Sequence, residues 1–145
     1  MAYSASASAT VNASREKVWD TLTKPEQVKE YFFGTNLVTT WEPNTPIYFR
    51  GEWEGKTYED KGIVQSFDAP NSLSYTYWSS MSGTLDEPEN YQTLRYDLVD
   101  AAGGEGGTNV TITQENVESQ EKADHSSENW KMVLQALKKF VEGNV

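Results

Sequence analysis

The 145-residue sequence contains no cysteine and a single histidine, His125. The lack of cysteine excludes disulfides, thiolate zinc sites and cysteine nucleophiles, and it is compatible with a reducing compartment. One histidine cannot build a multi-histidine metal site. We therefore expect no metal site, and no motif in the sequence indicates a cofactor.

Basic residues and long apolar runs are also scarce. Twelve Lys and Arg stand against 22 Asp and Glu, and the formal net charge of −10 argues against nucleic acid as a partner. The N-terminus lacks the basic and apolar regions of a secretory signal. No apolar run approaches the roughly 20 residues of a membrane span. We expect a single domain over residues 1–145 that is monomeric and cytoplasmic, with no membrane partner.

A long amphipathic segment is present near the C-terminus. Its apolar residues recur at the i, i+3, i+4, i+7 spacing that places one stripe along a helix. They are Trp130, Val133, Leu134, Leu137, Phe140 and Val141. Because a helix with one apolar stripe must bury it, and strand-like sequence precedes this one, we expect the helix to lie on an antiparallel sheet.

The rest of the chain predicts strands with two short helices after the first of them. Period-two alternation predicts strands over residues 3–11, 37–41, 47–53, 57–67, 73–78, 91–99 and 108–116. Ser14 is placed to cap the first short helix, and Thr23 with Glu26 has the capping-box spacing for the second, which Gly34 ends. Adjacent strands joined by short turns predict an α+β fold with a meandering antiparallel sheet.

Two local motifs indicate structure more than chemistry. The glycine-rich residues 103–107 precede a strand and lack the Gly-Lys-Ser/Thr of a phosphate-binding loop, so we interpret them as a hairpin loop. His125 lies between Asp124 and Ser126, but neighbours on one helical turn do not form a catalytic triad. The polar stretch 79–90 is long for a connection, and such loops are often functional.

The acidic residues of the central strands are interpreted as surface charges. Glu52 and Glu54 share the strand face opposite Trp53, beside a turn where side chains are solvated. Glu59 and Asp60 lie next to Lys61 and are likewise expected at the surface. No catalytic residue is assigned.

Several segments together resemble a known family. They are residues 11–26, residues 62–67 with Pro70, Leu73 and Tyr75, the Gly107-Thr108 pair, and Trp130, Leu134, Leu137, Lys138 and Glu142. This pattern resembles the START-like, or SRPBCC, helix-grip superfamily. Within it, the chain is similar to bacterial proteins related to the C-terminal domain of the activator of the ninety-kilodalton heat-shock chaperone's ATPase.

The resemblance implies a seven-stranded antiparallel sheet wrapped around a long C-terminal helix, with two short helices after the first strand and a cavity between helix and sheet. The chain departs from the family at Asn129, where glycine is frequent, and at Tyr31-Phe32, where Trp-Phe is common. The second departure alters the expected shape of the cavity entrance. Members bind lipids, polyketide-like aromatics or hormones, a few are cyclases or hydrolases, and the eukaryotic namesake is a co-chaperone.

Three functions follow in order of preference. The first is non-enzymatic binding of an apolar ligand, a lipid or a polycyclic, flavonoid-like aromatic, in that cavity. The second is a co-chaperone or protein-interaction module acting on a chaperone. The third is an enzyme acting on a bound ring system, although no nucleophile, base and orienting group come together in the sequence.

Aromatic residues make up 12% of the chain, and two interpretations of them stay open: an ordinary core and a ligand pocket. The residues expected to line the cavity are Trp41, Phe49, Trp53, Tyr75, Tyr77, Tyr96, Trp130, Met132 and Leu134. A shift of one residue in strand parity would turn a whole set of them toward solvent.

Overall fold

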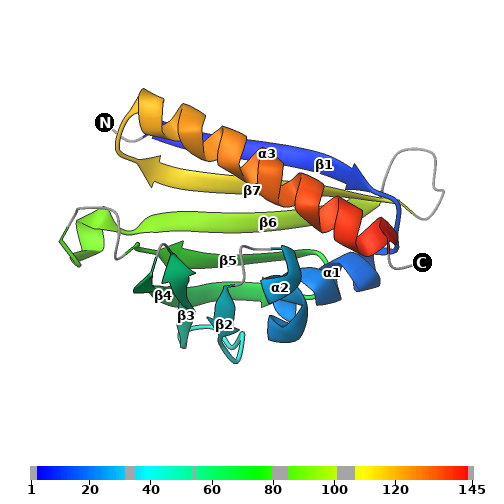
Figure 1. The fold of residues 1–145 in the computed structure, drawn as a ribbon, viewed down its shortest axis with the longest axis horizontal. Helices are drawn as coiled ribbons and strands as arrows, with labels where there is room; N and C mark the ends of the chain where they lie inside the picture. Colours follow the sequence, from blue (N-terminus) through cyan, green and yellow to red (C-terminus); the bar gives the residue numbers. More distant parts are fainter. Residues whose placement is uncertain (1–2, 32–34, 54, 80–84, 101–106, 144–145) are drawn as a thin grey trace.

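The computed structural model describes residues 3–31, 35–53, 55–79, 85–100 and 107–143 (Figure 1). Its elements are β1 (Tyr3–Val11), α1 (Arg15–Thr23), α2 (Pro25–Tyr31), β2 (Asn36–Val38), β3 (Pro46–Trp53), β4 (Lys56–Asp68), β5 (Ser72–Tyr77), the 3-10 helix η1 (Pro88–Asn90), β6 (Gln92–Asp100), β7 (Thr108–Val117) and α3 (Gln120–Gly143). Gly34, most of the glycine-rich loop and part of the stretch 79–90 lie outside the described residues.

The strands form one antiparallel sheet in the order β1-β7-β6-β5-β4-β3-β2. In Figure 1, α3 runs along β1 and β7, and its C-terminal end reaches toward α1 and α2. The predicted α+β helix-grip fold is confirmed. Among the described helices, none has the length and apolar character needed to cross a membrane.

Strand alternation places one apolar face of the sheet under α3. Ile47 and Phe49 are buried in β3, and Tyr96 of β6 pairs with Ile112 of β7, both of them also buried. Leu137 of α3 is fully buried in the same cluster of side chains. The expected strand parity is therefore correct, and the interior lies between α3 and the sheet.

The edge strand β1 brings α3 close because its inward residues are small. Ala5 and Ala7 are buried, and Ala5 packs with Val117 and with Ala123 of α3. The helix begins at Gln120, well before the apolar stripe that predicted it. Its first turns are mostly polar, so the stripe does not extend to them.

Three local expectations have clear outcomes. Ser14 caps α1, its side chain accepting a hydrogen bond from the Lys17 backbone N–H. Thr23 does not cap α2: it ends α1, where its hydroxyl donates to the Trp19 carbonyl at 2.8 Å, and Pro25 begins α2 almost at once. The strand expected over 37–41 stops at Val38.

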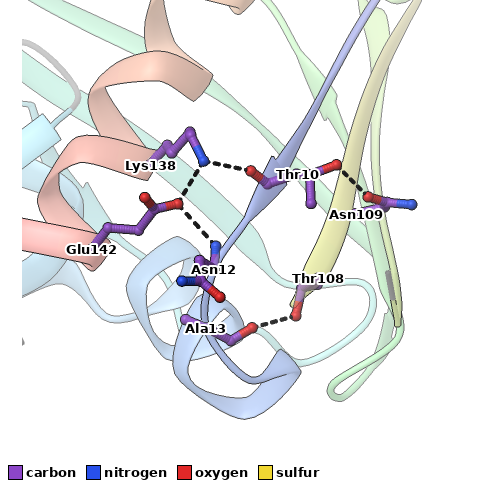
Figure 2. A network of polar contacts seen from close by, with 7 residues as sticks. All are labelled: Thr10, Asn12, Ala13, Thr108, Asn109, Lys138 and Glu142. Atoms are coloured by element: carbon purple, nitrogen blue, oxygen red, sulfur yellow. Dashed lines mark hydrogen bonds and ion pairs between the residues drawn. The ribbon is translucent and has the colours of Figure 1, made fainter. Parts of the chain in front are cut away.

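The C-terminal end of α3 is tied to the end of β1 by side chain to backbone contacts (Figure 2). Lys138 Nζ donates to the Thr10 carbonyl at 2.9 Å and to Glu142 Oε2 at 2.6 Å. The same Glu142 oxygen accepts the Asn12 backbone N–H at 2.9 Å. These contacts occupy backbone groups at the edge of the sheet, which would otherwise be open to another strand.

Candidate functional site

Eight aromatic rings form a connected series from α1, across the inner face of the sheet, to α3. We call this series the aromatic row. Its members are Trp19, Phe67, Trp41, Tyr75, Phe49, Tyr77, Tyr96 and Trp130. Rings in contact have centroids 5.2 to 6.3 Å apart, which is the range in which aromatic side chains attract one another. The row branches at Tyr75, one branch reaching Tyr77 through Phe49 and the other reaching Trp130 through Tyr96.

Trp41 anchors the end of the row near α1. Its ring stacks on Phe67 with an interplanar angle of 28°, and Phe67 in turn contacts Trp19. The indole N–H donates to the Thr23 carbonyl at the end of α1, at 2.9 Å. The backbone of Trp41 has φ 61, which is strained for a bulky residue, so the packing and the hydrogen bond must offset that strain.

Tyr75 lies at the centre of the row and is 1% exposed. Its ring contacts Trp41, Phe49 and Tyr96. The Tyr75 and Tyr96 hydroxyl oxygens are 2.6 Å apart and form a buried hydrogen bond. Burial raises the pKa of Tyr96 to about 12, and burial followed by the field of Tyr96 raises the pKa of Tyr75 well above its usual value.

Tyr31 of α2 belongs to the same group of hydroxyls. It is buried, and its pKa is raised well above the usual value by burial and then by Tyr96. The resemblance related Tyr31 only to the shape of the cavity entrance, and no contact with other phenols was expected for it. Three phenols from α2, β5 and β6 therefore influence one another inside an otherwise apolar interior.

At the α3 end of the row, two glutamine side chains continue from Trp130 through hydrogen bonds. Trp130 Nε1 donates to Gln114 Oε1 at 2.8 Å, and Gln114 Nε2 donates to Gln92 Oε1. Gln114 is buried although it is polar. Its partners account for both ends of the side-chain amide, as a buried amide requires.

A branch of the row, from Tyr75 through Phe49 to Tyr77, ends at a buried carboxylate, Asp60. The Tyr77 hydroxyl donates to Asp60 Oδ2 at 2.6 Å, and Asp60 is 8% exposed. Burial, and then the charge of Asp60, raise the pKa of Tyr77 well above its usual value. The expectation that Asp60 is a surface charge is wrong: it pairs across the β3–β4 hairpin with Phe49, which faces inward, so Asp60 faces inward too.

Glycine at position 51 makes room for the second phenol near Asp60. A Cβ at Gly51 would lie 2.5 Å from the hydroxyl oxygen of Tyr58, its cross-strand partner. The Tyr58 ring therefore lies across Gly51, and its hydroxyl is 2.8 Å from Thr35 Oγ1. Sequence reasoning missed Tyr58 and Asp60, and the register of the hairpin was the signal that would have found them.

The predicted lining residues divide into four groups. Six of them are in the aromatic row: Trp41, Phe49, Tyr75, Tyr77, Tyr96 and Trp130. Leu134 is 1% exposed and packs in the same core, whereas the Trp53 side chain lies outside the described part of the structure. Met132 is wrongly predicted because it is 62% exposed. At about 100° per residue, position 132 falls nearly opposite Trp130 on the helix.

Of the other acidic candidates, Glu52 and Glu59 lie at the surface, as does His125, whereas Glu54 lies outside the described residues. Glu52 and His125 are exposed, and exposed Glu59 pairs with Arg50 at 2.7 Å. Within the described residues, no group of three or more His, Asp or Glu is gathered as a metal site would require. Among the described residues, the buried polar groups of the interior are phenols, aliphatic hydroxyls, amides and the Asp60 carboxylate.

Comparison with known proteins places this geometry in a family. The family model described as "Activator of Hsp90 ATPase homolog 1-like protein" matches residues 12–142. The solution structure of ChR145 from Cytophaga hutchinsonii is 39% identical, with a TM-score of 0.83, over 98% of this chain and 95% of that protein. No curated protein matches the sequence.

Two more distant structures share the fold. DynU16, a putative protein in the dynemicin biosynthetic locus, is 14% identical with a TM-score of 0.78; the match covers 96% of this chain and 47% of DynU16. The Aha1 dimer from Colwellia psychrerythraea is 16% identical with a TM-score of 0.72, over 97% of this chain and 96% of that one.

Proposed function

The chain belongs to the family of Activator of Hsp90 ATPase homolog 1-like proteins, and we propose that it binds a small ring compound between α3 and the inner face of the sheet. The aromatic row carries this proposal. Its rings offer flat apolar surface, and the Tyr75 and Tyr96 hydroxyls add directional hydrogen bonding in a buried setting. Ligand sites commonly combine an apolar lining with a few such polar groups.

The hydroxyl pair supports a polycyclic, phenol-like compound over a purely aliphatic lipid. A phenol both donates and accepts, so a ligand hydroxyl can enter between Tyr75 and Tyr96 without leaving either one unpaired. An aliphatic chain would separate the same hydroxyls without replacing their hydrogen bond, at a cost of about 1–3 kcal/mol for each group left unpaired. The occurrence of the fold in DynU16, from the dynemicin biosynthetic locus, supports a small molecule as the ligand.

Chemical-shift mapping tests this proposal directly. The ¹⁵N-labelled protein is titrated with planar polycyclic phenols and, separately, with fatty acids. We expect the phenols to shift amides of β5, β6 and the Trp130–Leu137 part of α3. If the phenols shift none of these amides, the proposal fails, whether or not the fatty acids bind.

A pair of tyrosine variants shows whether the hydroxyls take part. Tyr96→Phe removes one hydroxyl of the buried pair and is expected to weaken phenol binding about tenfold. Tyr48→Phe is the matched control because Tyr48, on the other face of β3, stacks against Arg50. If Tyr96→Phe and Tyr48→Phe bind the phenols with equal affinity, binding depends on the aromatic rings and not on the hydroxyls.

A co-chaperone role is the second candidate. The family match and the shared fold with the Colwellia psychrerythraea Aha1 dimer favour it. Purified protein added to a ninety-kilodalton heat-shock chaperone should then raise its rate of ATP hydrolysis. An unchanged rate over a wide range of concentrations would remove this candidate. The monomeric state expected from the sequence stays a prediction.

A further inference from the structure

The buried carboxylate lies at the end of the Tyr77 branch of the aromatic row, which is partly open to solvent. Asp60 is itself 8% exposed, but Tyr58 and Tyr77 beside it are half-buried. Tyr75 and Tyr96, further along the row, are 1% and 5% exposed. A compound approaching the row from solvent at this end therefore meets Asp60 and its two phenol neighbours first.

The surroundings of Asp60 attract positive charge. Its cross-strand partner is Phe49, Tyr77 donates to it, and Tyr58 lies two residues away on the same face of β4. A carboxylate attracts a cation through its charge, and the faces of aromatic rings do so through their quadrupole. Both effects are stronger where water is partly excluded.

Two basic residues of β3 and β4, Arg50 and Lys61, are directed elsewhere. The third, Lys56, is exposed at the start of β4; by strand alternation it shares the face of Asp60, but it lies four residues, or about 13 Å, away along the strand. Arg50 Nε is 2.7 Å from Glu59 Oε2, and Lys61 Nζ is 2.5 Å from Asp86 Oδ2. By strand alternation, Arg50, Glu59 and Lys61 lie on the outer face of the sheet. These two cations are thus paired with other carboxylates.

From this arrangement we infer that the site takes ring compounds that carry a protonated amine, with the ammonium group against the Asp60 carboxylate and the ring system along Tyr77 and Phe49. The inference rests on the proposed function and narrows its ligand class. A carboxylate offers about four acceptor positions, so an ammonium group can bind beside the Tyr77 hydroxyl without displacing it. A fatty acid is disfavoured because its carboxylate is repelled by Asp60 and by the net charge of −10.

Three probes with one ring system and different charge test the inference. They are 1-naphthylmethylammonium, 1-methylnaphthalene and 1-naphthoate, titrated into the ¹⁵N-labelled protein at neutral pH. We expect the ammonium probe to bind about tenfold more tightly than the neutral probe, with naphthoate the weakest. Asp60→Asn should abolish the difference between the ammonium and neutral probes while the neutral probe still binds.

Glu59→Gln is the matched control for the loss of one negative charge. It neutralises the adjacent carboxylate, which faces the other side of the sheet, and should keep the tenfold preference. If Asp60→Asn fails to fold, Tyr77→Phe serves instead: it removes the phenol donor and leaves the carboxylate, so the preference for the ammonium probe should be kept or increased. A preference lost in Tyr77→Phe would overturn the inference.

The outcomes separate the two proposals. Equal binding of the ammonium and neutral probes by the unmodified protein overturns the role of Asp60 and leaves ring binding standing. If Glu59→Gln removes the preference as fully as Asp60→Asn does, the preference depends on overall charge. That result also overturns the inference. If none of the three probes shifts a resonance of the aromatic row, ring binding and the inference fail together.

Discussion

Tyr75 and Tyr96 share a hydrogen bond where water does not compete, so each hydroxyl depends on the other. Tyr75→Phe or Tyr96→Phe alone leaves a buried hydroxyl without this partner and should lower the free energy of unfolding by about 1–3 kcal/mol. The double variant should cost clearly less than the sum of the single ones. Urea unfolding of the four proteins measures the coupling, and additive losses would show that the hydroxyls act independently.

The raised pKa of Tyr96 predicts alkaline sensitivity. Its pKa is about 12 in the folded protein, mainly because of burial, against 10.0 for an unperturbed tyrosine. Below pH 10 both states keep the proton, and stability is unaffected. Above pH 10 the unfolded state loses the proton first, so the free energy of unfolding falls by up to about 1.4 kcal/mol per pH unit for this residue until pH 12 is approached.

Urea unfolding between pH 8 and pH 11.5 measures this loss, with tyrosinate absorbance as the independent record of ionisation. Tyr96→Phe should show a shallower decline above pH 10 than the unmodified protein. A decline of the same slope in both would mean that Tyr96 does not contribute to it.

Four of the predicted lining residues, Phe49, Tyr75, Tyr77 and Tyr96, were placed on the inner face from the sequence because alternation along a strand is a local property. Trp130 was placed there by helical periodicity. Asp60 was not, because a carboxylate beside Lys61 is ordinarily solvated, and only the pairing with Phe49 turns it inward. Met132 shows the converse error: apolar character alone suggested burial, but its angular position on α3 directs it to solvent. The type of a residue favours burial or exposure, but its position in the strand pairing or around the helix decides whether it faces the interior or solvent.

At the scale of elements, the contact between α3 and β1 depends on a few polar groups at the end of both. Glu142→Ala removes the acceptor of the Asn12 amide and the partner of Lys138. Hydrogen exchange at the Asn12 amide should become several-fold faster, because that amide is then open to water. Glu128→Ala is the control, since Glu128 pairs only with Lys131 among the described residues and does not reach β1.

The same contact should weaken in acid. The hydrogen bond from Lys138, and then the Asn12 backbone N–H, lower the pKa of Glu142 below its usual 4.5. Its stabilising contribution is therefore present above pH 4.5 and is lost as the pH falls through the lower folded value. Faster exchange at Asn12 in acid, corrected for the intrinsic pH dependence of exchange, records this loss. If the exchange rate at Asn12, corrected in this way, does not change in acid, Glu142 does not stabilise the end of β1.

The elements themselves were largely predictable. The range of β1 agrees with its expected bounds, and the ends of β3 to β7 differ from theirs by at most one residue. The start of α3 was missed because its first turns pack Ala123 against Ala5 and Val117 rather than a wide apolar stripe. Small residues allow a helix to pack closely, but they do not produce the stripe of large apolar residues by which helices are recognised in a sequence.

At the scale of the whole molecule, the excess of acidic residues opposes compaction. With a net charge of −10, the folded chain repels itself more than the expanded one does. Raising sodium chloride from about 0.05 to 0.5 M shortens the screening length several-fold, so the urea midpoint should rise. A midpoint that falls would mean that ion pairs such as Lys61–Asp86 outweigh the repulsion. Urea is the denaturant of choice because guanidinium is itself a salt.

The sequence by itself determined the fold class, the order of the elements and the apolar face of each, because these follow from local periodicity and turn chemistry. Only the tertiary structure decided which side chains meet across the interior. The Tyr75–Tyr96 hydroxyl pair, the phenols around Asp60 and the hold of Glu142 on β1 join residues far apart in the chain. Their contacts depend on the pairing of strands and the placing of α3, which local patterns do not encode.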